Sequence, residues 1–295
     1  RYLIMKIQLY SSTIRRKEMD AVLSCLVEEK TGPGELNLRL VQSVKEYFGV
    51  SGVVALRSPS LALKYALKTF QLEQDSKIMI SALAPDWQYS AIVDLGYIPM
   101  VLDVSLSNGL VEIETIKQGI LEGGKILLYH ETSGMLPNME DLLELGIPII
   151  EDISQSSLAS IGEKKAGTFG VFSILGLEER DLLTAGGGAC LIAPLSRDWA
   201  ALRNLVEKMP LTDKLPDINA ALAFVQLKES ARNEEIRKGM YEMYMRSLMQ
   251  GRHKSLVSAV ENGNQAVFSF PVLLESGMKD VKQYAAKKEI EIAPA

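Results

Sequence analysis

The chain has few of the residues that build metal sites and disulfide frameworks. Its 295 residues include two cysteines and two histidines. Cys25 and Cys190 lie far apart in apolar contexts, which is typical of small core side chains. Two histidines, His130 and His253, also argue against a zinc site. We therefore expect no metal, and the scarcity of cysteine fits a reducing, cytoplasmic compartment.

Long apolar runs and basic blocks are absent as well. No apolar run approaches the roughly 20 residues that a membrane-spanning helix needs. The 32 basic and 37 acidic residues are interspersed and give a net charge of -5, so neither a membrane nor nucleic acid is an expected partner. A strand-like run begins at Met5, which we expect to be the natural first residue. Residues 1–4 are too short for a signal peptide.

What the chain does contain is an alternation of strand-like and helix-like segments. Continuous apolar strands that alternate with helices indicate an α/β fold with a mostly parallel sheet covered on both faces. The expected strands are 53–56, 77–80, 98–104, 125–129, 147–152, 171–174 and 189–192. The expected helices are 15–29, 38–48, 59–70, 87–95, 113–121 and 139–145.

The pattern changes near Pro216. Beyond it, periodicity predicts a helix over 218–251, a strand over 266–274, a helix over 281–287 and a strand-like end over 290–292. These elements indicate the start of a smaller α+β domain. We therefore predict a large domain over 1–215, then a helical linker and a partial C-terminal domain over 216–295.

The strongest local signal for chemistry is Asp152, which follows Glu151 at the end of a buried strand. Ligands in open α/β sheets bind at this edge, and a carboxylate there is costly without a partner. One interpretation pairs Asp152 with a protonated pyridine nitrogen. The other makes it a helix cap or a salt-bridge partner, and spacing alone favours neither.

Serine residues suggest where a phosphate could bind. Ser58 and Ser60 surround Pro59 between a strand and a helix, and a helix N-terminus offers N–H groups to an anion. For Ser58 alone, a simple helix cap is the favoured interpretation. Ser173 could also reach a phosphate. Trp87 could stack on a flat ligand, although an aromatic residue at the start of a core helix is more often part of the packing.

These signals belong to a series of short motifs that occur in a fixed order along the chain. In that order they resemble the DegT/DnrJ/StrS family of aminotransferases, which act on nucleotide-linked keto-sugars, from about residue 10 to residue 290. The motifs are Ser12-Thr13-Ile14, Gly32-Pro33-Gly34, residues 54–60, Leu95-Gly96-Tyr97-Ile98-Pro99, Leu102-Asp103-Val104, His130 with Gly134, residues 149–156 and 164–170, Phe172-Ser173, Gly187-Gly188-Ala189 and residues 216–222.

The resemblance implies a pyridoxal-phosphate (PLP) enzyme of fold type I that works as a homodimer. By motif, Asp152 would hold the pyridine nitrogen and Gln155 would lie against the ring. Ser58, Ser60 and Ser173 would hold the phosphate. Family chains usually continue beyond the point where this one stops, so part of the small domain is expected to be missing.

The chain departs from the family at the lysine that forms the internal aldimine. Counting forward from Phe172 puts Glu178 in the lysine position, and counting back from Gly187-Gly188 puts Arg180 there. Neither a carboxylate nor a guanidinium forms a Schiff base. Other departures are Pro59 in the phosphate turn, Pro85 at the position of the ring-stacking aromatic, and residues 212–215 in the segment that faces a neighbouring subunit.

Three functional hypotheses follow. The first is a degenerate, non-catalytic homologue that could still bind a nucleotide-sugar. The second is a working PLP- or PMP-dependent aminotransferase or dehydratase acting on nucleotide-linked keto-sugars in polysaccharide or cell-surface sugar biosynthesis. The third is a structural or assembly protein on the same scaffold. If no cofactor binds, Asp152 needs other donors from Ser154, Ser156, the following turn or Arg180. We predict an Asp152–Arg180 contact, direct or through one water.

Overall fold

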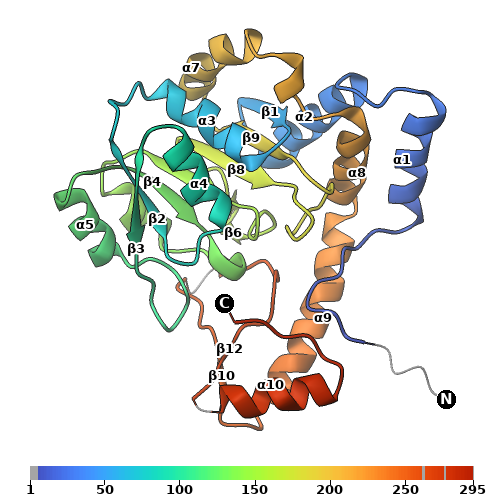
Figure 1. Ribbon diagram of the computed structural model, residues 1–295, viewed down its shortest axis with the longest axis vertical. Helices are drawn as coiled ribbons and strands as arrows, with labels where there is room; N and C mark the ends of the chain where they lie inside the picture. The colour runs from blue at the N-terminus through green and yellow to red at the C-terminus, as the bar shows by residue number, and fades with distance from the viewer. Residues whose placement is uncertain (1–5, 261–262, 276, 295) are drawn as a thin grey trace.

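A twisted seven-stranded sheet forms the centre of the computed structural model, which describes residues 6–260, 263–275 and 277–294 (Figure 1). Its strands run in the order β1-β9-β8-β5-β4-β2-β3. The five strands from β8 to β3 pair in parallel, whereas β9 pairs antiparallel with both β8 and β1. The mostly parallel sheet is therefore confirmed. Its strands are β1 (Gly52–Leu56), β2 (Lys77–Ser81), β3 (Ile98–Leu102), β4 (Gly124–His130), β5 (Ile149–Asp152), β8 (Phe172–Gly176) and β9 (Ala189–Ala193).

Helices cover both faces of this sheet and bury one apolar cluster on each side. This explains why the strands are continuously apolar rather than alternating. One cluster takes side chains from α2 (Glu35–Phe48), α5 (Ile113–Leu121), α6 (Met139–Leu143) and α8 (Asp217–Lys228). The other takes them from α3 (Pro59–Thr69), α4 (Asp86–Asp94) and α7 (Ser196–Glu207).

Local sequence signals set several of the helix ends. Gly49 ends α2 in the left-handed conformation, with φ of 68°, which glycine adopts without a steric penalty. Ser58 caps α3 by accepting a 3.2 Å hydrogen bond from the Leu61 amide, and Pro59 occupies the first helical position. The helix end at residue 48 and the cap at Ser58 were predicted, and both are confirmed.

A long-range contact fixes α8 against α2. The Asp217 carboxylate accepts hydrogen bonds from the backbone amides of Gly34, Leu36 and Asn37, at 2.8, 3.1 and 2.9 Å. These are the amides that a helix N-terminus leaves without partners. The charge also lies at the positive end of the helix dipole. Asp217, 181 residues after Leu36 in the chain, therefore completes the first turn of α2.

The C-terminal region differs from the sequence expectation in two places. The helix predicted over 218–251 is two helices, α8 and α9 (Ser230–Leu248). The strand predicted over 266–274 is wrong, because that stretch contains only the two-residue β12 (Val272–Leu273), paired with β10 (Lys254–Ser255). Beyond β12 lies α10 (Met278–Lys287), and the boundary predicted at residue 215 stays a prediction.

Smaller elements surround the main sheet. Of the strand-like end at 290–292, only Ile290 pairs, in a bridge to Ile7; Met5, the expected first residue, lies outside the described residues. No helix in the described part of the chain is long and apolar enough to cross a membrane. The remaining elements are α1 (Arg16–Val27), β6 (Ser160–Ile161), β7 (Lys164–Lys165), β11 (Gly263–Asn264), and the short 3-10 helices η1 (Thr132–Gly134) and η2 (Leu211–Asp213).

Candidate functional site

Asp152, at the end of β5, is fully buried and fully hydrogen-bonded by the chain itself. Its Oδ2 atom accepts from Gln88 Nε2 at 2.6 Å and pairs with His130 Nδ1 at 2.9 Å. Its Oδ1 atom accepts from both the amide and the hydroxyl of Ser154, at 3.1 and 2.5 Å. A carboxylate has about four lone-pair sites, and four donors from this chain fill them.

This network keeps Asp152 ionised. Burial opposes the charge, but the neighbouring His130 and the two Ser154 donors outweigh burial and lower the pKa of Asp152 below its ordinary value. The ionised carboxylate requires a proton on Nδ1 of His130, while Nε2 of that ring has no hydrogen-bond partner among the described residues. His130 ends β4, the strand beside β5.

A second buried acidic pair lies beside this network. The Glu151 carboxylate accepts from the backbone amides of Gly167, Phe169 and Gly170 at 2.6 to 2.8 Å. Glu131 accepts from the Ser156 hydroxyl. Burial, and then the charge of Glu151, raises the pKa of Glu131 well above its ordinary value. Burial also raises the pKa of Glu151, but the three amides oppose that rise, so the proton is held more firmly by Glu131.

The segment expected to carry the lysine is a closed turn between β8 and β9. The backbone amide of Leu177 donates to the carbonyl of Gly188 at 2.9 Å. Within the turn, Glu178 Oε1 accepts from the Gly188 amide at 3.3 Å, and Asp181 Oδ2 accepts from the Glu178 amide at 2.7 Å. Burial raises the pKa of Asp181 to about 7, with smaller contributions from the charges of Asp152 and Glu178.

The predicted direct contact between Asp152 and Arg180 is wrong. Arg180 is exposed, and its guanidinium lies 5.0 Å from the centre of the Tyr10 ring, a cation–π arrangement. The donors to Asp152 come instead from α4, from the end of β4 and from Ser154. Ser154 was among the expected alternatives, whereas Ser156 donates to Glu131.

Three other sequence-predicted residues do not join the network. Ser58 caps α3, and Ser60 is half-buried in the first turn of that helix. Trp87 packs partly buried against the core under α3 and α4, and the next residue, Gln88, reaches Asp152. No hydrogen bond within the described ranges links Ser58, Ser60 or Trp87 to Asp152.

Gln155 and Ser173 likewise bind the chain itself. Gln155 Oε1 accepts from the Ser133 amide at 2.6 Å, and the fully buried Ser173 hydroxyl donates to the Gly167 carbonyl at 2.8 Å. Ser173 is in register with Glu151, so it shares that residue's face of the sheet. Asp152 points to the opposite face, because successive strand residues alternate.

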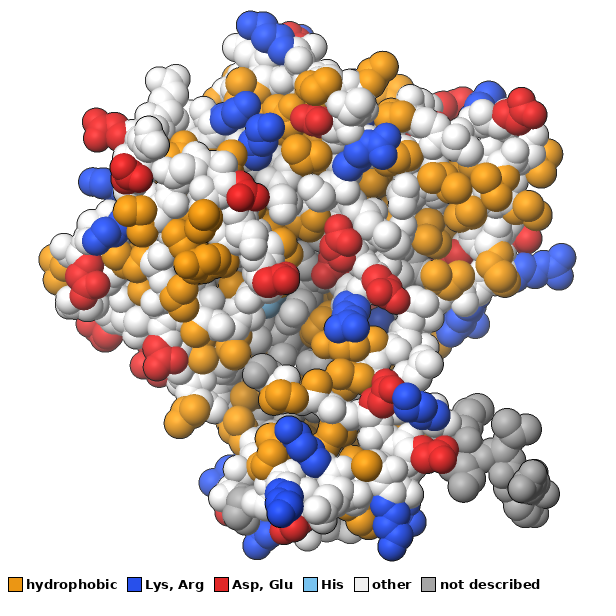
Figure 2. All heavy atoms as spheres, in the orientation of Figure 1, with side chains coloured by type: hydrophobic (Ala, Val, Ile, Leu, Met, Phe, Trp, Pro, Cys, Tyr) orange, Lys and Arg blue, Asp and Glu red, His pale blue; other side chains and the backbone are white. Residues whose placement is uncertain are grey.

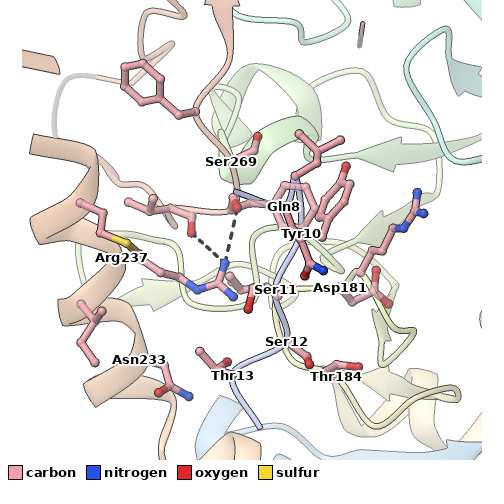
Figure 3. A pocket seen from close by; sticks show the side chains of 18 of the residues that line it. Gln8, Tyr10, Ser11, Ser12, Thr13, Asp181, Thr184, Asn233, Arg237 and Ser269 are labelled. Atoms are coloured by element: carbon pink, nitrogen blue, oxygen red, sulfur yellow. Dashed lines mark hydrogen bonds between the residues drawn. The ribbon is translucent and has the colours of Figure 1, made fainter. Parts of the chain in front are cut away.

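A separate cavity of about 390 Å³ lies between the N-terminal segment, the β8–β9 turn, α9 and residues 267–270. Figure 3 shows Ser11, Asp181, Asn233, Arg237 and Ser269 around it, from these four segments. In the space-filling view, the surface is hollowed between the body that holds the sheet and the part that carries α10 (Figure 2). No pattern in the sequence indicates this cavity, because its walls come from four distant stretches of chain.

Arg237 is the main cation of the cavity wall. It extends from α9 toward the N-terminal segment (Figure 3). Its Nη1 atom donates long hydrogen bonds to the carbonyls of Val267 and Phe268, at 3.5 and 3.4 Å. Burial lowers the pKa of Arg237, and no carboxylate forms a salt bridge with it in the described part of the chain.

One sequence signal could have located part of the Asp152 network. His130 and Asp152 both end strands that are neighbours in a parallel sheet, so their side chains reach the same edge. Gln88 carried no such signal, since its contact depends on how α4 is placed. No group of three or more His, Cys, Asp or Glu side chains suited to a metal occurs among the described residues.

Comparison with known proteins adds an independent line of information. The profile of the DegT/DnrJ/EryC1/StrS aminotransferase family matches residues 12–294. The chain is 22% identical over 179 residues to L-glutamine:2-deoxy-scyllo-inosose aminotransferase of Micromonospora echinospora, covering 58% of this chain and 43% of the relative. It thus spans less than half of that relative's length.

Longer alignments reach other relatives. GDP-4-keto-6-deoxy-D-mannose 3-dehydratase of Escherichia coli O55:H7 is 21% identical over 306 residues, covering 90% of this chain and 78% of the relative. Among solved structures, the PLP-form of the putative sugar aminotransferase Spr1654 of Streptococcus pneumoniae superposes with a TM-score of 0.87 at 16% identity. That superposition covers 97% of this chain and 83% of the other, and shows that the two chains share a fold.

Proposed function

Because the chain belongs to the DegT/DnrJ/EryC1/StrS aminotransferase family, we propose that it is a catalytically degenerate member that forms no Schiff base. PLP is the cofactor that the family and its PLP-form neighbour indicate. Schiff-base chemistry requires a lysine amine, and residues 175–188 contain no lysine. Glu178 and Arg180, the two candidates for that position, cannot replace it.

The observation that carries this proposal is the saturation of Asp152. A protonated pyridine nitrogen could reach this carboxylate only by displacing Gln88, His130 or Ser154. Each displacement would leave a buried donor without a partner, which costs about 1–3 kcal/mol. The residues around Asp152 therefore do not fit the cofactor ring, and we derive no reaction step through it.

Acidic side chains in the turn after β8 also disfavour an anionic cofactor. Asp181 and Glu178 lie in the turn that follows β8, and after burial the charges of Asp152 and Glu178 raise the pKa of Asp181 further. The phosphate of PLP is itself an anion, and like charges in a partly buried site disfavour one another. Ser58 and Ser173, the expected phosphate ligands, are engaged by α3 and by Gly167.

The test is to mix the purified chain with PLP, record the visible absorption spectrum, reduce with borohydride and analyse the peptides by mass. We expect no aldimine band and no stoichiometric phosphopyridoxyl-lysine. Lys164, Lys165 and Lys214 are the residues to examine first. Lys165 already donates to the backbone carbonyl of Tyr47, and its Nζ atom lies 3.7 Å from the centre of the Tyr47 ring. Urea-unfolded chain, whose lysines are all accessible, is the control for the labelling chemistry. A one-to-one adduct at one lysine of the folded chain would refute the proposal.

The alternative is a functional PLP- or PMP-dependent aminotransferase or dehydratase acting on nucleotide-linked keto-sugars. Its support is the alignment with GDP-4-keto-6-deoxy-D-mannose 3-dehydratase over 90% of this chain. Equilibrium dialysis with PMP separates the two proposals, since PMP can bind without a Schiff base. One PMP per chain, lost in Asp152→Asn, would favour the alternative.

We also propose a cytoplasmic homodimer that retains affinity for a nucleotide-sugar and serves polysaccharide biosynthesis. The support for the dimer is an apolar face on α1, where Met19, Leu23 and Val27 are all exposed. Figure 2 shows apolar side chains gathered over this region. Such faces on a water-soluble chain commonly mark an interface.

A further inference from the structure

Two completely buried glutamates, Glu131 and Glu151, meet on one face of the main sheet. Glu151 on β5 is in register with Tyr129 on β4. The Glu131 amide continues this pairing by donating to the Asp152 carbonyl at 3.3 Å. Because Glu131 lies two positions after Tyr129, its side chain points to the same side of the sheet as that of Glu151. The two carboxyl groups are hydrogen-bonded to each other, which requires a proton on one of them.

The remaining hydrogen bonds of the pair indicate which glutamate carries that proton. Both oxygens of Glu151 accept from backbone amides of residues 167–170, and three N–H donors favour the charged form of a carboxyl group. Glu131 accepts from the Ser156 hydroxyl through Oε2, while its Oε1 atom meets no donor among the described residues. A proton on Glu131, donated toward Glu151, therefore satisfies the pair.

The surroundings of the pair supply no cation. In the part of the chain that the structure describes, neither glutamate belongs to a salt bridge. Lys165, two positions before the first of the amides that bind Glu151, donates instead to the Tyr47 carbonyl. A second negative charge on the pair would thus be buried beside the first without compensation, which is costly.

Other titratable side chains near the pair do not relieve this cost. Asp152 adds a further negative charge that acts on Glu131, and His130 is already paired with Asp152. Burial, and then the charge of Glu131, raises the pKa of Tyr129, so its phenol is a neutral neighbour. Burial and the charge of Glu151 hold the pKa of Glu131 well above its ordinary value. While it stays buried, the pair therefore resists the loss of its shared proton.

Glu131 also begins the turn that attaches the C-terminal region to the sheet. The 3-10 helix η1 follows it directly, with Ser133 in the left-handed conformation at a φ of 56°, which is strained for a residue with a side chain. The Gly134 carbonyl accepts from the Ala266 amide at 3.3 Å, and the hydroxyls of Ser133 and Ser269 lie 3.3 Å apart. Movement of η1 would therefore loosen this attachment.

We propose that the Glu131–Glu151 pair is a pH-sensitive latch, which holds η1 and the C-terminal region on the sheet through its shared proton and opens when that proton is lost to water. Glu131 is the half that moves, because one hydroxyl binds it whereas three amides hold Glu151. In the open arrangement Glu131 reaches water and ionises at its ordinary pKa. Rising pH therefore favours opening, by up to about tenfold per pH unit, until pH reaches the raised pKa of the closed pair, where the effect levels off.

The experiment is hydrogen–deuterium exchange of the full chain between pH 5 and pH 9, with exchange times scaled to the intrinsic rate at each pH. We expect peptides that cover residues 131–135 and 266–269 to exchange faster, relative to the intrinsic rate, as pH rises. Peptides that cover residues 167–170 should change less, because Glu151 keeps its three amide donors.

Infrared spectroscopy detects the shared proton directly. Asp181→Asn removes another buried acid whose pKa is raised. In that variant we expect a protonated-carboxyl C=O stretching band at pH 7, where ordinary carboxyl groups are ionised. The band should disappear when Glu131→Gln is added. Its absence from Asp181→Asn would overturn the proposal.

Matched variants separate the roles of the two glutamates. Glu131→Gln keeps a donor toward Glu151 and an acceptor for the serine hydroxyl but has no proton to lose, so exchange at residues 131–135 should no longer depend on pH. Glu151→Gln turns an NH₂ group toward three backbone N–H groups, so those amides should exchange faster at every pH. Glu144→Gln, at an exposed position just after α6, is the control and should behave as wild type.

Each result bears on the latch. Exchange at residues 131–135 that stays constant with pH in wild type would overturn it, as would a pH dependence that persists in Glu131→Gln. If Glu151→Gln fails to fold, Glu131→Gln and the infrared band still decide the question. None of these measurements involves PLP, so the latch is tested separately from the proposed loss of Schiff-base chemistry.

Discussion

Gln88 Nε2 donates a 2.6 Å hydrogen bond to Asp152 Oδ2, and both side chains are completely buried. The contact joins α4 to the end of β5 across one face of the sheet. It also takes a lone pair at the position where a family member would hold its cofactor ring. The proposed loss of Schiff-base chemistry and the stability of the core would thus depend on the same atoms.

Replacement of Gln88 should therefore be costly. We expect Gln88→Leu to lower the free energy of unfolding by about 2 kcal/mol, the usual contribution of a hydrogen bond to a charged group. Urea denaturation with an unchanged m-value measures this. Gln42→Leu is the control, because Gln42 only bonds Glu46 on an exposed helix face, worth less than about 0.5 kcal/mol. Equal effects in the two variants would contradict the assigned role.

Stability should depend on pH through Asp181. Its pKa is about 7 in the folded chain against an ordinary value of 3.8, so the unfolded chain loses this proton first as pH rises. The stability therefore decreases between pH 4 and pH 7, by up to about 4 kcal/mol for this group. Asp181→Asn should remove that decrease, making the variant more stable than wild type at pH 8 and similar at pH 4. Denaturation curves at the two pH values test this, and a less stable variant at pH 8 would reverse the assignment.

Asp152 makes the stability depend on pH in the opposite direction to Asp181. Its folded pKa is lowered, so its contribution to stability is present above the unfolded value and is lost as pH falls through the folded value. Acid unfolding of Asp152→Asn should accordingly show a weaker pH dependence below about pH 4 than that of wild type.

We expect that a lysine placed at position 178 or 180 does not restore covalent binding of PLP. We expect Glu178→Lys to show no aldimine band with PLP, because Gln88, His130 and Ser154 still fill the lone pairs of Asp152. Arg180→Lys should behave in the same way, since Arg180 lies over Tyr10. The measurement is the visible spectrum before and after borohydride. A stable aldimine band in Glu178→Lys would mean that the PLP ring can displace a side chain that is bound to Asp152.

The α1 face provides a test of the dimer. We expect wild type to sediment as a dimer at micromolar concentration and Leu23→Glu to sediment as a monomer, because a buried charge without a partner is unfavourable at an interface. Leu121→Glu, at an exposed leucine on α5, is the control and should stay dimeric. A monomeric wild type would refute the proposed dimer.

The sequence by itself determined the architecture. Apolar strands alternating with helices specify a parallel sheet, because only a sheet covered on both faces buries such strands. Local chemistry also specified the turn at Gly49, the cap at Ser58 and the buried position of Asp152, since each depends on neighbouring residues alone. The absence of lysine from residues 175–188 likewise needs no structure to be read.

Only the tertiary structure decided which groups meet. Gln88 and Asp152 are 64 positions apart, and their contact depends on how α4 packs on the sheet. Arg180 was the predicted partner because it is a cation in or near the lysine position and could neutralise Asp152, whereas packing directs Arg180 to Tyr10. The cavity around Arg237 could not be predicted for the same reason. Side-chain patterns report which face of an element is buried, and the contacts across that face follow from the placement of distant elements.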